Sequence, residues 1–216
     1  MKKRLVIFDL DGTLVDTIDD LALSANHALG TEGYPTHELA RYRAMVGGGI
    51  RKLIERALPE QARCEASIER VRREMVAWYD HHDTVHSRPY PGISELLVDL
   101  AERGVAMAVA SNKYNAATRR IVAHFFPDVA FVAVFGQRKN VKLKPDPMVV
   151  RHVLKAAKIG AGETLFVGDS VIDVETARAA GVESVAVSWG FCPRAELEAA
   201  RPDHIVDHAQ QIVRLV

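Results

Sequence analysis

The chain has few of the features that mark secreted, membrane-embedded or nucleic-acid-binding proteins. Its 216 residues include only two cysteines, Cys64 and Cys192, too few for the disulfide framework of a small secreted domain. Basic and acidic residues number 28 each, so the composition offers no basic surplus for a general nucleic-acid surface. No apolar run approaches the length that spans a bilayer. We therefore expect neither a nucleic acid nor a membrane as partner.

The basic start of the chain, residues 1–4, leads into apolar residues as a secretory leader does. Asp9 interrupts this apolar segment too early, however, and no small-residue cleavage site follows. These features predict a cytoplasmic protein. Apolar residues make up 48% of the sequence, as in ordinary globular proteins. The length suffices for one core with a smaller appended domain, and it is compatible with a monomer or a homodimer.

The most informative segment is the acidic pentad Asp9–Thr13, which directly follows the apolar run Leu5–Phe8. Asp-Gly is typical of hairpin turns, and Asp is a common helix N-cap. A hairpin needs a second strand, whereas apolar residues continue here at helical spacing: Leu14, Ile18, Leu21, Ala22, Ala25 and Leu29. Two carboxylates at the end of a buried strand repel each other unless a cation intervenes. The order strand, acidic turn, helix favours a phosphate or metal site.

The C-terminal part of the chain alternates between strands and helices. The sequence predicts strands over residues 105–110, 131–135, 164–167, 184–188 and 204–206. It predicts helices over 115–125, 147–158 and 174–180, the last of them closed by Gly181. Such alternation indicates an α/β fold with a parallel sheet, to which Leu5–Phe8 adds a further strand.

Residues 15 to about 86 break this alternation and show helical periodicity only. Two apolar stripes mark the helices: Leu53, Ile54, Ala57 and Leu58 in one, and Ile68, Val71, Met75, Trp78 and Tyr79 in the other. We expect a core of residues 1–14 and 87–216 carrying an α-helical domain of residues 15–86, with hinges at 15–17 and 86–89. His81, His82 and His86 suggest a zinc site near the second hinge, but an exposed helix end explains them more simply.

Three further polar signals follow or flank the predicted strands. Ser111-Asn112 follows the strand 105–110, Gly168-Asp169 follows the strand 164–167 with Asp173 four residues later, and Lys144-Pro145 precedes a helix. Each signal alone also fits a turn, a helix cap or a solvated surface residue. Because the carboxyl ends of parallel strands meet at one edge, we expect the carboxylates, the hydroxyl and the ammonium to share one crevice.

This set of groups suits phosphoryl transfer. A carboxylate can attack phosphorus to form an aspartyl-phosphate. Magnesium prefers hard oxygen ligands from one or two carboxylates and from the substrate's phosphate. The ion would also screen the anionic phosphate from an anionic nucleophile. A lysine and a serine hydroxyl would supply the remaining charge and hydrogen bonds.

The four motifs Asp9-x-Asp11-Gly12-Thr13-Leu14, Ser111-Asn112, Lys144-Pro145 and Gly168-Asp169-x-x-x-Asp173 resemble, in order, those of the haloacid dehalogenase-like phosphatases. The resemblance spans the predicted core. It implies a Rossmann-like parallel sheet with helices on both faces, and it implies that residues 15–86 form a helical cap. Pro89–Gly92 and Gly168–Ser170 resemble the phosphoglycolate phosphatase branch. Ile172 departs from that branch, which often carries asparagine at this position.

The resemblance also implies roles for individual residues. Asp9 is the expected nucleophile. Asp11 is expected to protonate the leaving alcohol and then to accept a proton from the hydrolytic water. Mg²⁺ would bind Asp9, the backbone carbonyl of Asp11, and Asp169, while Asp173 would hold the metal's water shell or Lys144. Ser111 would donate to the phosphate, and Lys144 would neutralise charge on Asp9 and the phosphoryl group. Backbone amides around Asp11, Gly12 and Asn112 would complete the phosphate site, and Thr13 is a further expected substrate contact.

The cap is expected to contribute substrate contacts from one glycine-rich segment. Gly47–Gly49 interrupts the helices, and such a loop can either be a flexible turn or approach the substrate with its backbone. Gly48 and the nearby Arg51, which could pair with a substrate carboxylate, are the predicted contacts.

Three functions remain open from the sequence. The leading hypothesis is a magnesium-dependent phosphatase for a small phosphorylated metabolite, with 2-phosphoglycolate as one candidate. The acid at position 11 favours phosphate-ester hydrolysis over dehalogenation, which has no leaving alkoxide to protonate. The second hypothesis is a phosphosugar mutase that uses the same aspartyl-phosphate, and the third is a non-enzymatic phosphate-binding module.

Overall fold

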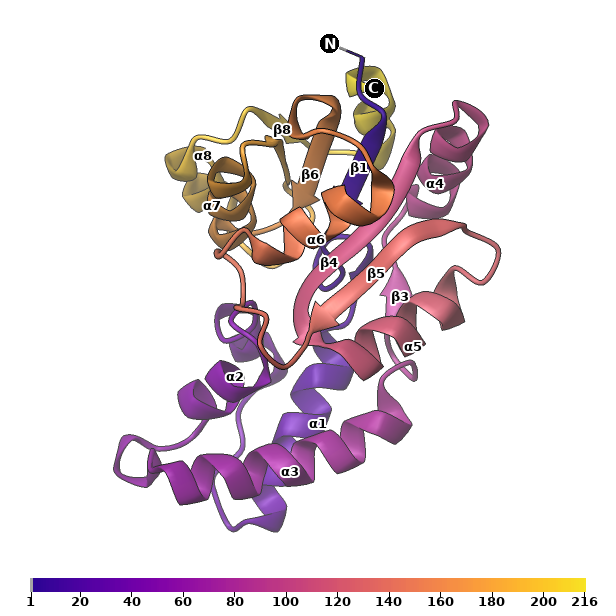
Figure 1. Cartoon of the computed structure of the whole chain (residues 1–216). Coiled ribbons are helices and arrows are strands. Elements are labelled where there is room, and N and C mark those ends of the chain that lie inside the picture. Colours follow the sequence, from indigo (N-terminus) through magenta and orange to yellow (C-terminus); the bar gives the residue numbers. More distant parts are fainter. Residues whose placement is uncertain (1) are drawn as a thin grey trace.

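A six-stranded parallel sheet forms the centre of the protein in the computed structural model, which describes residues 2–216 (Figure 1). The strand order is β5-β4-β1-β6-β7-β8. Their bounds are Leu5–Phe8 for β1, Ala106–Tyr114 for β4, Phe131–Gln137 for β5, Thr164–Gly168 for β6, Glu183–Val187 for β7 and His204–Val206 for β8. Neighbouring strands pair in parallel throughout this sheet, as the alternating sequence pattern predicted.

Helices cover both faces of this sheet because the side chains of each strand alternate between two apolar layers. In β1, Val6 and Phe8 join the layer that contains α4 (Ile93–Glu102), α5 (Asn115–Phe125) and the 3-10 helix η4 (Ala209–Leu215). Leu5 and Ile7 face the other layer, with α6 (Met148–Ala157) and α7 (Val171–Ala180). All four residues of β1 are fully buried. The predicted α/β class is therefore confirmed.

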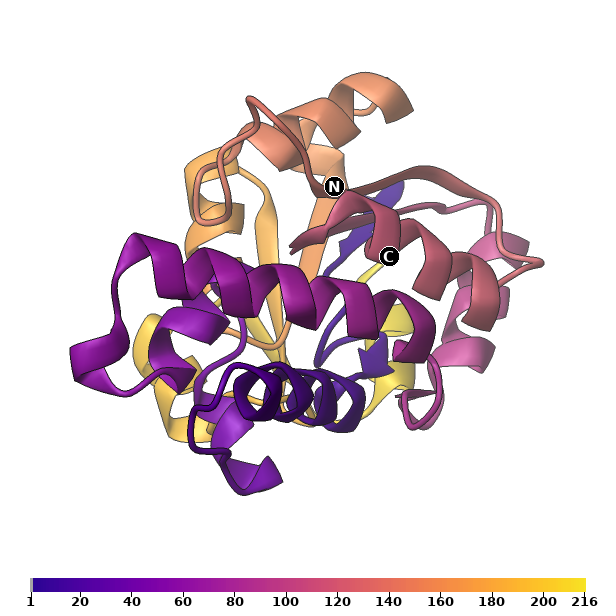
Figure 2. The same cartoon turned by 90° about the horizontal axis from the view of Figure 1, so that it is seen from below.

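A group of helices lies apart from the sheet, in the lower part of Figure 1. It comprises α1 (Ile18–Thr31), the 3-10 helix η1 (Leu39–Ala44), α2 (Ile50–Ala57), the 3-10 helix η2 (Glu60–Ala62) and α3 (Glu65–His82). Helices α1 and α3 pack against each other, and Figure 2 shows them crossing this end of the molecule side by side. The apolar stripes predicted for this region supply the apolar residues that are buried in α2 and α3. Trp78, predicted as part of the second stripe, is instead exposed.

Two short strands connect the helical group to the sheet. Strand β2 (Val15–Asp16) pairs antiparallel with β3 (Arg88–Pro89). Asp20 adds a buried anchor beside them, because its carboxylate accepts hydrogen bonds from the backbone N–H of His86 and from both the N–H and the hydroxyl of Ser87. The prediction of helices only over residues 15–86 is thus wrong at Val15–Asp16. A two-residue strand is too short to show the alternation that marks longer strands.

Several element bounds differ from the sequence prediction. Strand β4 continues to Tyr114 rather than ending at Ala110, and its pairing with β5 shifts register between Ala110 and Tyr114. Helix α7 begins at Val171, three residues earlier than predicted, because Ser170 and Asp173 form a capping box. Helices α4 and α8 (Arg194–Ala200) and the short helix η4 were not predicted from the sequence. Gly181 closes α7 with φ of 70°, as predicted.

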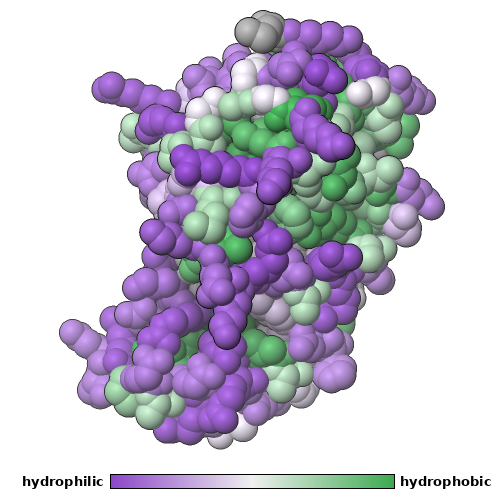
Figure 3. Space-filling view, viewed as in Figure 1, coloured by the Kyte–Doolittle hydropathy of each residue, from purple (hydrophilic) through white to green (hydrophobic). Residues whose placement is uncertain are grey.

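Both polar and apolar side chains are exposed on the face of the molecule drawn in Figure 3. In the view of Figure 3, polar side chains cover much of the lower helical part, and apolar side chains show between charged ones on the upper part. A bilayer-spanning helix would need a longer apolar stretch than any helix within residues 2–216 provides.

Candidate active site

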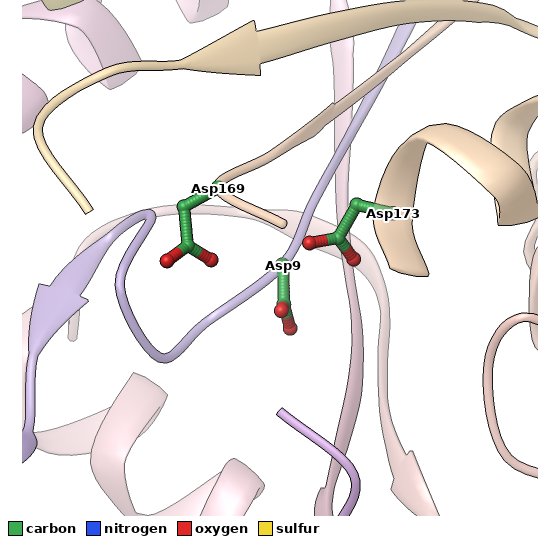
Figure 4. A group of neighbouring side chains, drawn as sticks. All are labelled: Asp9, Asp169 and Asp173. Atoms are coloured by element: carbon green, nitrogen blue, oxygen red, sulfur yellow. The ribbon is translucent and has the colours of Figure 1, made fainter. Parts of the chain in front are cut away.

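Acidic side chains from separate elements meet at the carboxyl edge of the sheet. Asp9 directly follows β1, Asp169 directly follows β6, and Asp173 lies in the first turn of α7. One carboxylate oxygen of each residue lies within 4.8 Å of an oxygen of the other two. Figure 4 shows the three side chains clustered around a common space, with Asp9 between the other two. Parallel strand order brings these residues together, as the sequence pattern predicted.

Burial makes the ionised forms of these carboxylates costly. The pKa of Asp9 rises from 3.8 to about 6, chiefly because the group is removed from water; Lys144 lowers it, and the charges of Asp173 and Asp11 raise it. Burial, with the nearby Asp173 and Asp9, likewise raises the pKa of Asp169 well above its ordinary value. The cluster therefore holds more negative charge than its own surroundings neutralise.

Lys144 is the cation closest to this cluster. Its Nζ lies 3.0 Å from Oδ1 of Asp9 and 2.7 Å from Oδ1 of Asp173, and its side chain is only 1% exposed. Burial alone would lower the pKa of Lys144, but the carboxylates of Asp173 and Asp9 raise it above its ordinary value. Lys144 thus contacts both Asp9 and Asp173, the two carboxylates that the sequence placed beside it.

The single positive charge of Lys144 does not balance the three neighbouring carboxylates, so a second cation would be stabilised here. Hard carboxylate oxygens on buried, rigid elements are the donor set that a small divalent ion such as Mg²⁺ takes. Close packing by two glycines holds the Asp169 side chain in place. A Cβ on Gly12 would lie 2.2 Å from Asp169 Oδ2, and a Cβ on Gly190 would lie 2.2 Å from Asp169 Cβ. The residues present therefore fit a metal ion.

The carboxylate of Asp11 is directed to other partners than the cluster. Its Oδ1 accepts hydrogen bonds from Thr17 Oγ1 at 2.6 Å and from Lys113 Nζ at 2.8 Å. The predicted metal ligand at this position is the backbone carbonyl of Asp11, and that assignment stays a prediction. Asp11 still lines the same cavity as Asp9 and Asp169.

The turn after β1 can pass close to Asp169 because of its glycine. Gly12 adopts φ of 78°, a left-handed conformation that side-chain-bearing residues rarely adopt. The next residue, Thr13, points its hydroxyl toward Asp169 Oδ1 at 3.5 Å, at the limit of a hydrogen bond. The glycine predicted for the phosphate site is thus also required for packing against the acidic cluster.

A segment after β7 supports Asp169 from the other side. The backbone N–H of Phe191 donates to Asp169 Oδ2 at 2.7 Å, and Gly190 packs against the same carboxylate. The sequence analysis did not identify this segment. Its only signal in the sequence is a glycine that follows the strand predicted over 184–188.

Asn112 fastens two loops to the edge of the sheet. Its side-chain amide donates to the carbonyls of Gly47 and Lys144 at 3.0 and 3.1 Å, and its Oδ1 accepts from the backbone N–H of Lys144 at 2.8 Å. The side chain of Asn112 thereby positions Lys144 and the glycine-rich loop of the helical group. Ser111 lines the cavity beside it.

A cavity of about 590 Å³ lies between the sheet edge and the helices. The sheet edge contributes the predicted residues Asp9, Asp11, Ser111, Asn112 and Asp169, together with Lys113. The helical group contributes Arg43, Gly47, Gly49, Arg56 and Tyr79. Four of these cavity residues, Lys113, Arg43, Arg56 and Tyr79, were not assigned to the site from the sequence. Gly47 and Gly49 belong to the glycine-rich loop that was expected to approach the substrate.

The two cap contacts predicted by residue number do not line this cavity. The guanidinium of Arg51 instead forms a two-pronged ion pair with the exposed Glu65, at 2.8 and 2.6 Å. Gly48 lies between the two glycines that do line the cavity. Helix α2 buries Leu53, Ile54 and Ala57, and Arg51 extends from a different side of the helix. This arrangement argues against a substrate contact by Arg51.

Two of the histidines near the second hinge have other contacts. His82 stacks on Trp78 and contacts its backbone carbonyl, and the backbone of His86 binds Asp20. Across residues 2–216, Asp9, Asp169 and Asp173 form the one group of three or more potential metal ligands whose donor atoms lie close together. Both cysteines are free thiols.

Known proteins resemble this chain over nearly its full length. The family model described as haloacid dehalogenase-like hydrolase matches residues 6–187. A phosphoglycolate phosphatase from Mesorhizobium japonicum is 34% identical, with 96% of this chain and 92% of the relative covered. A phosphoglycolate phosphatase from Vibrio cholerae is 30% identical over 99% of this chain and 96% of the relative. A solved structure described as a predicted phosphoglycolate phosphatase from Haemophilus somnus is 30% identical, covers 99% of this chain and 98% of its own, and superposes with a TM-score of 0.91.

Proposed function

The chain belongs to the haloacid dehalogenase-like hydrolase family, and we propose that it is a phosphatase that hydrolyses a small phosphate monoester through an aspartyl-phosphate at Asp9. One observation carries this proposal. The carboxylate of Asp9 lies at the end of β1, faces the cavity and contacts the Lys144 ammonium. The carboxylates of Asp169 and Asp173 lie next to it, where they could hold a cation. A nucleophile in such a site can approach an anionic phosphate because cations offset the repulsion.

The reaction has two steps. An oxygen of Asp9 attacks phosphorus while the bond from phosphorus to the ester oxygen breaks, and Asp11 gives its proton to the departing alkoxide. Water then attacks phosphorus, Asp11 takes up a proton, and the bond from phosphorus to Asp9 breaks to release inorganic phosphate. Asp9 and Asp11 thereby return to their starting states.

Other residues hold the phosphoryl group and its charge. Lys144 neutralises negative charge on Asp9, the Ser111 hydroxyl donates to a phosphoryl oxygen, and backbone amides around Asp11 and Asn112 complete the site. The backbone N–H groups of Gly12 and Thr13, which were also expected to bind the phosphate, donate instead to the carbonyls of Val15 and Leu10. Mg²⁺ held by Asp9 and Asp169, with Asp173 supporting it and the backbone carbonyl of Asp11 as a further ligand, would supply positive charge to the phosphoryl oxygens.

We propose that residues 15–86 act as the cap of a core made of 1–14 and 87–216. The paired strands β2 and β3 and the Asp20 anchor lie at the two crossings between these parts, where a hinge is expected. The glycine-rich loop and Arg43, Arg56 and Tyr79 close the cavity from the cap side. A closed cap would exclude bulk water during attack by Asp9.

The cavity favours a substrate with a second anionic group. Arg43 and Arg56 line it, and within residues 2–216 neither forms an ion pair with a carboxylate. Guanidinium groups bind carboxylates with strong, paired hydrogen bonds. The relatives named phosphoglycolate phosphatase point to the same kind of molecule. We therefore propose 2-phosphoglycolate as the leading candidate, in the cytoplasm as the composition predicts.

A phosphate-release assay tests the function. The full chain is incubated with 2-phosphoglycolate in Mg²⁺ and in excess chelator, and with a hexose 1-phosphate in parallel. We expect free phosphate from 2-phosphoglycolate only when Mg²⁺ is present. Isomerised sugar phosphate without net phosphate release would support the mutase hypothesis instead. No phosphate from either substrate or from p-nitrophenyl phosphate would contradict hydrolysis altogether.

A further inference from the structure

A buried lysine that the reaction scheme above does not use contacts the expected proton donor. Lys113 Nζ lies 2.8 Å from Asp11 Oδ1, and the side chains of Lys113 and Asp11 are 3% and 13% exposed. Lysine is rarely buried to this degree unless its charge is paired. Lys113 therefore depends on Asp11 for its place in the site.

The surroundings hold the ammonium of Lys113 on two sides. Its Nζ lies over the ring of Tyr79, 4.8 Å from the ring centre, and Tyr79 is a fully buried residue of helix α3 in the cap. Lys113 follows Ser111 by two residues in the irregular end of β4, and its backbone N–H donates to the Ser111 hydroxyl. The lysine thus joins the sheet edge, the acid and the cap.

Both hydrogen bonds to the Asp11 carboxylate go to the same oxygen atom, Oδ1. Thr17 Oγ1 and Lys113 Nζ both donate to Oδ1, at 2.6 and 2.8 Å. Oδ2 receives no hydrogen bond from the described part of the chain, residues 2–216. Two donors on one oxygen fix the orientation of the carboxyl plane and leave the other oxygen to carry the proton that is transferred.

We propose that Lys113 is a positioning residue that orients Asp11 so that its Oδ2 can protonate the leaving oxygen. The inference rests on the proposed function. As the bond from phosphorus to the ester oxygen breaks, the proton moves from Oδ2 of Asp11 to that oxygen, and Lys113 keeps its own proton throughout. In this role Lys113 acts through Asp11 and not on phosphorus or the leaving group.

The effect of a Lys113 substitution on kcat/KM should depend on the leaving group if Lys113 orients Asp11, and should not depend on it if Lys113 binds the phosphate. An alkyl ester such as 2-phosphoglycolate needs protonation of its leaving oxygen, whereas p-nitrophenyl phosphate leaves readily without it. In Lys113→Met, kcat/KM for 2-phosphoglycolate should fall by about 100-fold or more, the scale of general acid catalysis, and that for p-nitrophenyl phosphate by less than about tenfold. Lys155→Met, the same change at an exposed lysine on α6, is the matched control and should change neither.

A double variant excludes the alternative that Lys113 binds the substrate's carboxylate. If Lys113 acts through Asp11, adding Lys113→Met to Asp11→Asn lowers kcat/KM for 2-phosphoglycolate no further than Asp11→Asn alone. Losses that multiply would overturn the proposal, and so would equal losses of Lys113→Met on both esters. Circular dichroism and a thermal melt check the fold. If the methionine variant does not fold, Lys113→Gln, which keeps a polar end, carries the same comparison.

The same assays distinguish a wrong function from a wrong role for Lys113. If the unmodified protein hydrolyses neither ester in Mg²⁺, the proposed function fails and the role of Lys113 fails with it. If the unmodified protein hydrolyses both esters but Lys113→Met retains the ratio of their kcat/KM values, only the role of Lys113 is overturned.

Discussion

At the scale of single residues, the site is dominated by carboxylates that would be more stable if protonated or bound to a cation. The pKa of Asp9 in the folded chain is about 6, above its ordinary 3.8. The folded state therefore holds this proton more tightly than the unfolded state, so the contribution of Asp9 to stability is full below the ordinary pKa and is lost as the pH rises through about 6. The raised pKa of Asp169 acts in the same direction. A bound cation would reverse this loss.

Stabilisation by Mg²⁺ should accordingly increase with pH. Protons and the metal compete for the same oxygens, so the rise in melting temperature caused by Mg²⁺ should be clearly larger at about pH 7.5 than at about pH 5. Differential scanning calorimetry measures this difference. Asp169→Asn should remove most of the effect, and the exposed Asp128→Asn should retain it. An equal rise at both pH values would show that these carboxylates do not hold the ion.

Removing the nucleophile should separate activity from stability. Asp9→Asn should lower kcat for any substrate by on the order of 10⁴-fold or more, as loss of a covalent nucleophile does. The variant should melt at the same or a higher temperature than the unmodified protein without metal, because one buried charge is gone. Steady-state kinetics and calorimetry check both statements. Wild-type-like hydrolysis of p-nitrophenyl phosphate by this variant would refute the assignment of Asp9.

At the scale of elements, one buried carboxylate supports the connection between the helical group and the sheet. Asp20, at the start of α1, is 2% exposed and accepts hydrogen bonds from the backbone of His86 and from Ser87. These bonds tie the first crossing between the parts to the second. Helix α1 thereby holds the β2 and β3 strands in place.

Loss of this anchor should destabilise the fold. Asp20→Asn replaces an oxygen that faces donors with an amide that also donates, so it should cost about 1–3 kcal/mol in free energy of unfolding. Urea unfolding measures this cost. Asp19→Asn, the exposed neighbour on the same helix, should change the free energy by less than about 0.5 kcal/mol. Equal effects of the two changes would show that the buried contacts of Asp20 do not stabilise the connection.

The elements were predictable where the chain repeats a pattern for several residues. The fully buried β1 follows from an uninterrupted apolar run, and α5 from helical spacing over residues 115–125. Strand β2 and the early start of α7 were not predictable in this way. The first has two residues, and the second begins with a capping contact between side chain and backbone rather than with an apolar repeat.

At the scale of the whole molecule, the cavity lies between two parts that are far apart in the sequence. The sheet-edge residues of the site were predictable because parallel strands end at one edge, so Asp9, Ser111 and Asp169 had to meet. The cavity residues of the helical group were not predictable. Which arginine of a helix faces a neighbouring part depends on how that part packs, and Arg51 points to Glu65 while Arg43 and Arg56 reach the cavity.

The cavity arginines should determine preference for doubly anionic substrates. Arg43→Gln and Arg56→Gln should each raise KM for 2-phosphoglycolate by about 10-fold or more, the value of a lost charge-assisted hydrogen bond. KM for p-nitrophenyl phosphate, which lacks a carboxylate, should stay within about twofold. Arg51→Gln serves as the control and should leave both values unchanged. A selective rise in KM for 2-phosphoglycolate in Arg51→Gln alone would show that the cap arranges its arginines differently around the substrate.

Chemical trapping can show whether Asp9 becomes covalently phosphorylated during turnover. Borohydride reduces an aspartyl-phosphate to homoserine, which peptide mass spectrometry locates in the sequence. We expect homoserine at position 9 when the protein is quenched during turnover with Mg²⁺ and substrate, and none when either is omitted. Phosphate release without reduction at position 9, or reduction at another aspartate, would contradict it.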